Sequence, residues 1–121
     1  MSTSTVVHHR WSEVAPEQIT PAVSRQYLTG DRVTIARFEL KRGGVVPRHA
    51  HENEQVSLVL SGVLLFRIDG REVTVRGGEA LQIPGNVAHE VEVIEDTLVI
   101  DVFSPIRQDW LDKTDNYFGR T

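Results

Sequence analysis

The chain has 121 residues, enough for one domain with its own hydrophobic core and too few for two. Hydrophobic residues make up 40% and charged residues 25%, a globular balance that excludes a largely disordered chain. The 13 Lys and Arg residues against 17 Asp and Glu residues give a net charge of −4, so we expect neither nucleic acid nor an anionic membrane as a partner. The absence of cysteine excludes disulfides, thiolate nucleophiles and sulfur-ligated zinc.

Residues 1–30 are interpreted as an N-terminal extension that contributes an edge strand. They contain no basic segment followed by an apolar run, so no signal peptide is expected and a cytoplasmic location is the default. His8 and His9 are expected on the surface. The extension is long enough to add a strand to a neighbouring subunit. Its apolar residues are Val6, Val7, Trp11, Ile19 and Tyr27.

Residues 31–104 are predicted to form a β-barrel core, because short alternating stretches are separated by glycine-containing turns. The Asp69-Gly70 pair between two such stretches predicts a two-residue hairpin. This rhythm favours an all-β sandwich or barrel over parallel βαβ units. The predicted strands, in chain order, are 32–40, 55–60, 63–68, 72–75, 80–83, 89–94 and 97–103.

Residues 105–121 are predicted to be a C-terminal tail packed on the barrel. Ser104-Pro105 ends the last strand, and a short helical turn is expected around 105–111. The aromatic residues of the tail, Trp110, Tyr117 and Phe118, are expected to pack it onto the barrel.

The most informative polar residues are the histidines of His49-Ala50-His51. In a strand, residues two apart point to the same face, so the two imidazoles could bind one ion. Gln55 and Ser57 continue this parity if no bulge intervenes. The same pattern also occurs on solvated strand edges, so the pair alone does not decide between a metal site and an exposed surface.

The spacing around these histidines resembles the two motifs of the cupin family. The first motif, Gly-x5-His-x-His-x3or4-Glu-x6-Gly, is matched by Gly43, His49, His51, Gln55 and Gly62, with glutamine in the place of glutamate. The second is matched at Gly78, Pro84 and His89, with Asn86 and Val93 in the places of its second glycine and its asparagine. The resemblance implies a single-domain, all-β cupin fold, which is a double-stranded β-helix or jelly-roll barrel.

The resemblance also implies a metal site made by His49, His51, Gln55 and His89. One divalent transition metal ion, Ni, Mn, Fe, Co or Zn, suits imidazole and oxygen ligands without sulfur. A neutral glutamine leaves more of the ion's charge to attract an anionic ligand than a glutamate would. Two alternatives stay open: a bulge could make Glu54 the ligand, or Gln55 could be a hydrogen-bonding barrel residue without any metal.

Residues 101–111 resemble the C-terminal segment of one cupin subgroup, the unsaturated-uronate ring-opening proteins of pectin and alginate breakdown. That subgroup also uses three histidines and a glutamine. The resemblance implies Asp101 as a proton-transfer group, Phe103 as a pocket wall and Arg107 as a carboxylate partner. The structural alternatives are that Asp101 pairs with Arg37 or Arg67, that Phe103 is plain core and that Arg107 lies on the surface.

The function implied is a metal-dependent isomerase that converts 4,5-unsaturated uronates to the open-chain keto form. Its partners would be a small anionic substrate and a second copy of the chain in a homodimer. The alternatives are another metal-cupin enzyme, such as a dioxygenase or a lyase, and a non-catalytic ligand-binding cupin. Oxygen consumption would identify the dioxygenase, and thermal stabilisation by uronates without turnover would identify the binding protein.

Overall fold

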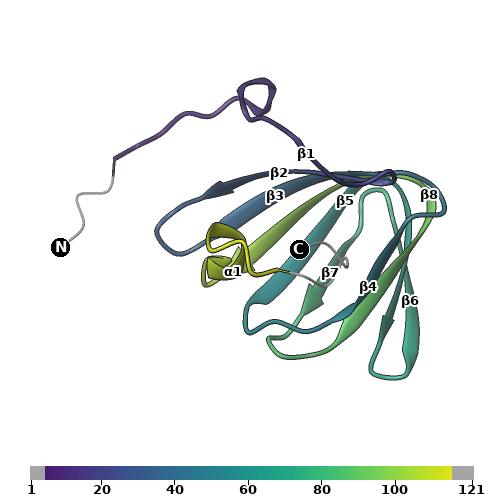
Figure 1. Ribbon diagram of the computed structural model, residues 1–121. Helices are drawn as coiled ribbons and strands as arrows, with labels where there is room; N and C mark the ends of the chain where they lie inside the picture. Colours follow the sequence, from purple (N-terminus) through teal and green to yellow (C-terminus); the bar gives the residue numbers. More distant parts are fainter. Residues whose placement is uncertain (1–4, 116–121) are drawn as a thin grey trace.

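The computed structural model describes residues 5–115, which form eight strands and two short helical segments. Figure 1 shows the strands curled into a barrel, from which the segment before the first strand extends away. The elements are η1 (Trp11–Glu13), β1 (Glu17–Thr20), β2 (Val23–Thr29), β3 (Thr34–Leu40), β4 (Val45–His49), β5 (Glu54–Ile68), β6 (Arg71–Arg76), β7 (Ala80–Ile83), β8 (His89–Ser104) and α1 (Gln108–Leu111).

Two long strands, β5 and β8, form the frame of the barrel. They pair with each other in antiparallel fashion along almost their whole length. The strand order is β1-β2-β3-β8-β5-β6, while β4 joins β8 and β7 joins β5. The all-β prediction is therefore confirmed, and the predicted Asp69-Gly70 hairpin joins β5 to β6 with both residues at positive φ, 57° and 74°.

The prediction of separate strands at 55–60 and 63–68, and again at 89–94 and 97–103, was wrong. Each pair is one continuous strand that bends, because the register between β5 and β8 shifts between Val59 and Leu64. Gly62 makes the bend possible: its φ is +100°, and a Cβ atom there would collide with the Asp96 carbonyl oxygen and the Thr97 side chain. Such bulges bend a strand without ending it.

The first 30 residues supply β1 and β2 to this chain's own sheet. β2 pairs with β3 over its full length, from Val23 opposite Leu40 to Thr29 opposite Thr34. β1 then lies at the sheet edge beside β2. The extension therefore contributes strands within the subunit.

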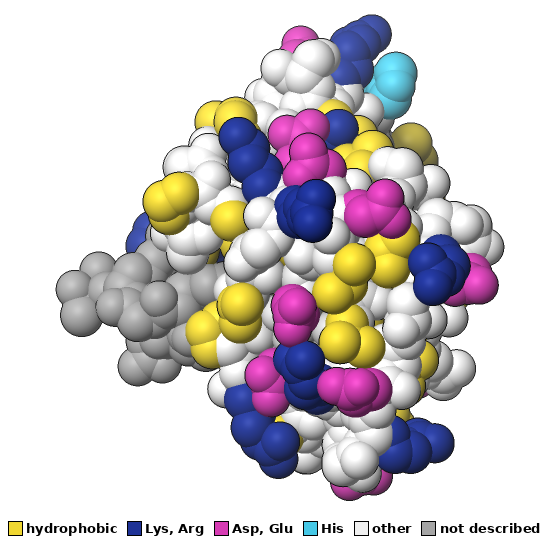
Figure 2. All heavy atoms as spheres, turned by 90° about the vertical axis from the view of Figure 1, so that its right-hand side faces the viewer, with side chains coloured by type: hydrophobic (Ala, Val, Ile, Leu, Met, Phe, Trp, Pro, Cys, Tyr) yellow, Lys and Arg dark blue, Asp and Glu magenta, His cyan; other side chains and the backbone are white. Residues whose placement is uncertain are grey.

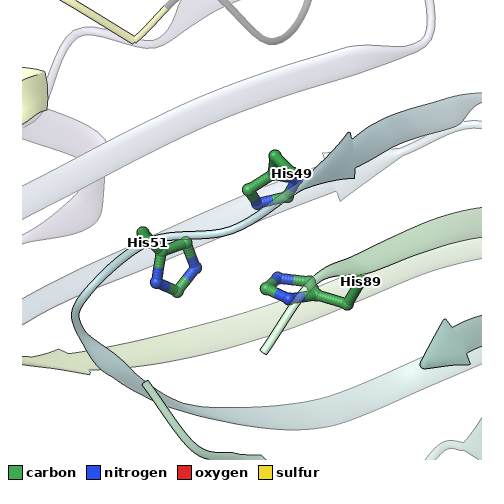
Figure 3. A group of neighbouring side chains, drawn as sticks. All are labelled: His49, His51 and His89. Atoms are coloured by element: carbon green, nitrogen blue, oxygen red, sulfur yellow. The ribbon is translucent and has the colours of Figure 1, made fainter. Parts of the chain in front are cut away.

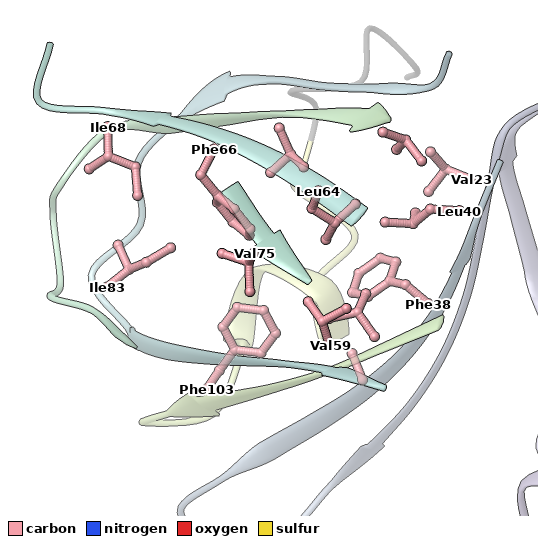
Figure 4. Packing of buried hydrophobic residues seen from close by; sticks show 14 of the residues in the cluster. Val23, Phe38, Leu40, Val59, Leu64, Phe66, Ile68, Val75, Ile83 and Phe103 are labelled. Carbon is pink, nitrogen blue, oxygen red and sulfur yellow. The ribbon is translucent and has the colours of Figure 1, made fainter. Parts of the chain in front are cut away.

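The hydrophobic core lies inside the barrel, where alternate residues of each strand point inward. Figure 4 shows these side chains converging from opposite walls. The core also includes Trp110 from α1, which is 1% exposed and anchors the short helix expected at 105–111. The other two aromatic residues of the predicted tail, Tyr117 and Phe118, lie outside the described residues.

The outer surface is charged in both signs. Figure 2 shows Lys and Arg side chains next to Asp and Glu side chains on one face, with small hydrophobic areas between them. Arg67, for example, contacts Glu72, Glu90 and Glu92. In residues 5–115 no helix is long and apolar enough to cross a membrane.

Candidate active site

Three histidines converge inside one end of the barrel. His49 ends β4, His51 follows in the loop before β5, and His89 begins β8. Each offers a ring nitrogen, and these nitrogens all lie within 4.8 Å of one another. Figure 3 shows the three rings facing a common centre. The structure thus brings together three of the four predicted ligands, although His51 lies just beyond the strand in which it was expected.

The backbone orients all three imidazoles in the same way. Nδ1 of His49 lies 2.8 Å from the Pro47 carbonyl oxygen, and Nδ1 of His89 lies 2.9 Å from that of Val87. Nδ1 of His51 lies 3.0 Å from the Asn53 carbonyl oxygen. A carbonyl can only accept, so each Nδ1 carries the hydrogen and each Nε2 keeps its lone pair. Backbone bonds of this kind are what fixes the tautomer of metal-binding histidines.

The rings are held in their neutral form. Burial lowers the pKa of His49 to about 3, against the raising effect of its bond to Pro47. Burial and, second, the charge of Arg107 lower the pKa of His51 to about 4. Burial likewise lowers the pKa of His89. Neutral imidazole is the form that binds a metal ion, so the cluster is ready to bind at neutral pH.

Gln55 is the fourth polar side chain at the centre. It is 5% exposed on β5, and its Oε1 lies 3.1 Å from Nε2 of His51. Its Nε2 donates to the Ser57 hydroxyl at 3.0 Å. Glu54 points to the opposite face, where it accepts a hydrogen bond from Gln82 at 2.9 Å. Gln55, and not Glu54, therefore faces the histidines.

The donor set fits a divalent transition metal. Nε2 of His89 is buried and has no hydrogen-bond partner among the described residues. Nε2 of His51 and Oε1 of Gln55 are both acceptors, yet they lie side by side, an arrangement that a shared cation would stabilise. Three imidazole nitrogens and an amide oxygen, without sulfur, suit Mn, Fe, Co, Ni or Zn.

Asp101 and Phe103 line the same cavity from the inner face of β8. Asp101 is buried opposite Ser57, and one of its carboxylate oxygens, Oδ1, has no hydrogen-bond partner among the described residues. Burial raises the pKa of Asp101 to about 6, although its hydrogen bond with Ser57 acts in the opposite direction. The structural alternative does not apply, because Arg37 and Arg67 bond to other residues.

The mouth of the barrel is the end at which the three histidines converge. Arg107 is buried at this mouth, with 1% of its surface exposed. Its Nε and Nη2 donate to the two carboxylate oxygens of Asp109 at 2.9 and 2.7 Å. The guanidinium lies over Phe103 at 4.7 Å and over Trp110 at 4.3 Å, favourable cation–π contacts. Burial alone would raise the pKa of Asp109, but the bonds and charge of Arg107 lower it overall.

A second arginine also contacts the ring of Trp110. Arg25, 1% exposed on β2, lies 4.3 Å from the Trp110 ring. It forms ion pairs at 3.2 Å with Glu17 and Asp115. The tail is therefore attached to the barrel by the contacts of Trp110 with the two arginines and by the ion pair of Arg25 with Asp115.

The cavity between the histidines and the core is narrow, about 40 Å³. That volume is close to what one water molecule occupies. A separate depression of about 250 Å³ lies outside, lined by His51, Asn53 and Asp109 among others. His51 and Asp109 therefore stand close to both the interior site and the outer surface.

The antiparallel barrel with histidines inside it defines the class of protein. The family model described as "Cupin domain" matches residues 36–103, more than half of the chain. The chain therefore belongs to the cupin family. The matched range runs from β3 to β8 and contains all four predicted metal ligands.

Known relatives narrow the comparison. The "Pectin degradation protein KdgF" of Dickeya dadantii (strain 3937) is 26% identical over 98 residues, which cover 78% of this chain and 89% of that protein. The solved structure of KdgF from Halomonas sp. matches with a TM-score of 0.76 at 27% identity, covering 82% of this chain and 94% of that one. An RmlC-like cupin from Shewanella frigidimarina matches with a TM-score of 0.81 at 24% identity over 90% of this chain and 99% of that one, a likeness in fold alone.

The sequence analysis assigned no role in the site to Asp109 or Ser57. Asp109 stands in the segment quoted for the resemblance, yet no sequence signal pairs it with Arg107. Ser57 was placed on the same face as Gln55 by parity, but its position opposite Asp101 depends on the pairing of β5 with β8.

Proposed function

We propose that this protein is a metal-dependent enzyme that converts 4,5-unsaturated uronates to their open-chain keto form. The observation that carries the proposal is the convergence of three neutral histidines and Gln55 beside a buried acid, Asp101, and a buried cation, Arg107. The similarity to two KdgF proteins, one of them called a pectin degradation protein, supports the same substrate class.

The reaction is an isomerisation, so no atom is gained or lost. The anomeric hydroxyl loses a proton, the bond between the anomeric carbon and the ring oxygen breaks, and the ring oxygen gains a proton, which gives an aldehyde and an enol. The enol then transfers its proton to solvent or to a protein group, and C4 gains a proton, which leaves a ketone at C5. The enzyme must therefore move protons and hold an anionic carboxylate.

The chain offers a group for each task. The pKa of Asp101 is raised to about 6 by burial, so this carboxyl can both hold and release a proton near neutral pH. Arg107 supplies the positive charge for the substrate carboxylate. Because Nε and Nη2 of Arg107 donate to Asp109, a substrate carboxylate would compete with Asp109 for the guanidinium group. Phe103 packs beside both the arginine and His51.

His49, His51, His89 and Gln55 would hold the metal ion. A divalent ion in this neutral set would supply Lewis acidity toward the oxygens of the substrate. Since the interior cavity of about 40 Å³ cannot contain a sugar ring, the substrate would enter from the outer depression as the side chains at the mouth move aside.

The test is an absorbance assay with metal-loaded protein and a 4,5-unsaturated galacturonate or mannuronate. Loss of the ultraviolet absorbance of the conjugated enol-acid faster than the spontaneous rate is expected. His89→Ala and Arg107→Ala should abolish the acceleration, while Arg48→Ala, an exposed arginine beside His49, should keep it. No acceleration with Ni, Mn, Fe, Co or Zn would refute the proposal.

The same preparation separates the other cupin functions. A dioxygenase would consume oxygen and lose activity in anoxic buffer, and a lyase would release a second product. A ligand-binding cupin would be stabilised thermally by uronates without turnover.

We also propose a homodimer. Leu58 and Leu60, on the outer face of β5, are 37% and 55% exposed, and exposed apolar side chains grouped on a sheet are typical of an interface. Light scattering should give twice the mass of the chain. A monomer at micromolar concentration would contradict this part of the proposal.

A further inference from the structure

A buried row of three hydrogen-bonding side chains connects Asp101 to the histidine cluster. Ser57 is 1% exposed and lies on β5 directly opposite Asp101 on β8. Its hydroxyl shares a hydrogen bond with the Asp101 carboxylate and lies 3.0 Å from Nε2 of Gln55. Beyond Gln55, Oε1 lies 3.1 Å from Nε2 of His51. The row therefore runs from an acid to a predicted metal ligand.

The chemistry of each group fixes the direction of these bonds. An ionised carboxylate only accepts, so Ser57 must give its single hydroxyl hydrogen to Asp101. The Ser57 oxygen then has only lone pairs left, and it must accept from the amide group of Gln55. The amide group can do this only through its NH₂, so its carbonyl oxygen is turned toward the histidines.

We propose that Ser57 is a positioning residue that makes Gln55 present its carbonyl oxygen, and not its NH₂ group, to the metal ion. This inference rests on the proposed metal site and adds a residue to it. The orientation matters because an amide nitrogen has no lone pair available for a metal, whereas the carbonyl oxygen has two. A glutamate at this position would need no such partner, since its two oxygens are equivalent. Ser57 is thus required because position 55 carries a glutamine in the place of the glutamate of the family motif.

Replacing Ser57 should therefore weaken metal binding in a specific pattern. Ser57→Ala removes the acceptor, so the amide loses its fixed orientation, and the affinity for Ni²⁺ or Zn²⁺ should fall about 10- to 100-fold. Ser57→Thr keeps the hydroxyl and should restore most of the affinity. Ser61→Ala, an exposed serine on the same strand, is the matched control and should leave the affinity unchanged.

A double-mutant cycle with Gln55→Glu separates orientation from general structural damage. In the Gln55→Glu background, Ser57→Ala should change the affinity less than threefold, because a carboxylate has no wrong orientation. Equal losses in both backgrounds, or no loss from Ser57→Ala in the native chain, would overturn the inference. The affinities are measured by competition with a chelating dye, so they do not depend on turnover.

A second measurement needs no metal. In the metal-free protein the Gln55 side-chain NH₂ should exchange slowly with solvent by NMR, and the protection should be lost in Ser57→Ala but kept in Ser57→Thr. An unprotected NH₂ in the native chain would overturn the inference even if metal binds. If the native chain binds none of the metals, the proposed metal site itself is refuted. This is measured first, before any serine variant is made, so the two failures can be told apart.

Discussion

The interior of the barrel has two ends that differ sharply, although the same strands line both. At the bend, where the register of β5 and β8 shifts, the inward side chains are apolar, and they include Val59, Leu64, Val93 and Val99. At the mouth, the inward side chains include Phe103 and four polar residues, which are Gln55, Ser57, His89 and Asp101. Alternation along each strand thus determines which side chains point inward. The position along the strand determines whether those side chains are apolar or polar.

The two ends also contribute differently to stability. Apolar burial at the bend is favourable, at about 25 cal/mol for each Å² removed from water. Buried polar groups at the mouth cost free energy unless they are satisfied, and Nε2 of His89 and Oδ1 of Asp101 have no hydrogen-bond partner among the described residues. The bend therefore stabilises the fold, and the mouth retains groups that a ligand can satisfy.

The largest expected effect is at the bend. Leu64 is 2% exposed, so Leu64→Ala should lower the free energy of unfolding by about 3 kcal/mol, through lost burial and the cavity left behind. Chemical denaturation measures this change. Val45→Ala, 50% exposed on β4, should cost less than about 0.5 kcal/mol. Similar costs for both would contradict the division between the ends.

The next effect is at the mouth and has the opposite character. His89→Ala removes one ligand and should weaken metal binding at least about 100-fold, equivalent to about 2.7 kcal/mol. The metal-free variant should stay within about 1 kcal/mol of the native chain, since the imidazole removed had an unsatisfied nitrogen. Calorimetric titration and thermal melts give the two numbers. A large loss of metal-free stability would assign His89 a structural role.

An intermediate effect is expected for the ion pair at the mouth. Asp109→Ala leaves the buried Arg107 without its bidentate partner. The loss should be about 1 to 2 kcal/mol, less than for a fully buried pair because a third of the Asp109 side chain is exposed. Glu13→Ala breaks the exposed pair with Arg10 and should cost almost nothing. Equal costs by denaturation would refute the distinction.

The metal-free protein should also show a pH dependence of its stability. The folded pKa values of His49 and His51, about 3 and 4, lie below the ordinary 6.5, so the unfolded chain takes up protons first. The contribution of these two neutral histidines to the free energy of unfolding is complete above pH 6.5. It is lost as the pH falls toward 4, by at most about 1.4 kcal/mol per pH unit for each histidine. Asp101, with its raised pKa, acts in the opposite direction between about pH 6 and 4. Denaturation at several pH values should show a net loss on acidification, shallower in His89→Ala, and a flat profile would contradict it.

The sequence predicted which polar side chains converge better than it predicted the strands. The spacing from Gly43 to Gly62 identified residues that the fold brings together, because that spacing encodes two strands and the loop between them. Ser61-Gly62 was interpreted as a turn, since a bulge and a turn use the same residues and differ only in what the partner strand does. The pairing of Arg107 with Asp109 depends on how the tail folds onto the barrel, and no local pattern specifies that.

The contacts around Trp110 have a consequence for the fluorescence of the protein. The chain has two tryptophans. The ring of Trp110 contacts the guanidinium groups of Arg25 and Arg107 and lies 5.1 Å from the Phe103 ring, which in turn contacts His51. Any ligand that moves Arg107 changes the electric field at the indole of Trp110 and hence the wavelength of its fluorescence emission. The other tryptophan, Trp11, lies in η1 outside the barrel and supplies a constant background. The fluorescence of Trp110 can therefore be used to follow ligand binding at the mouth of the barrel without an added dye.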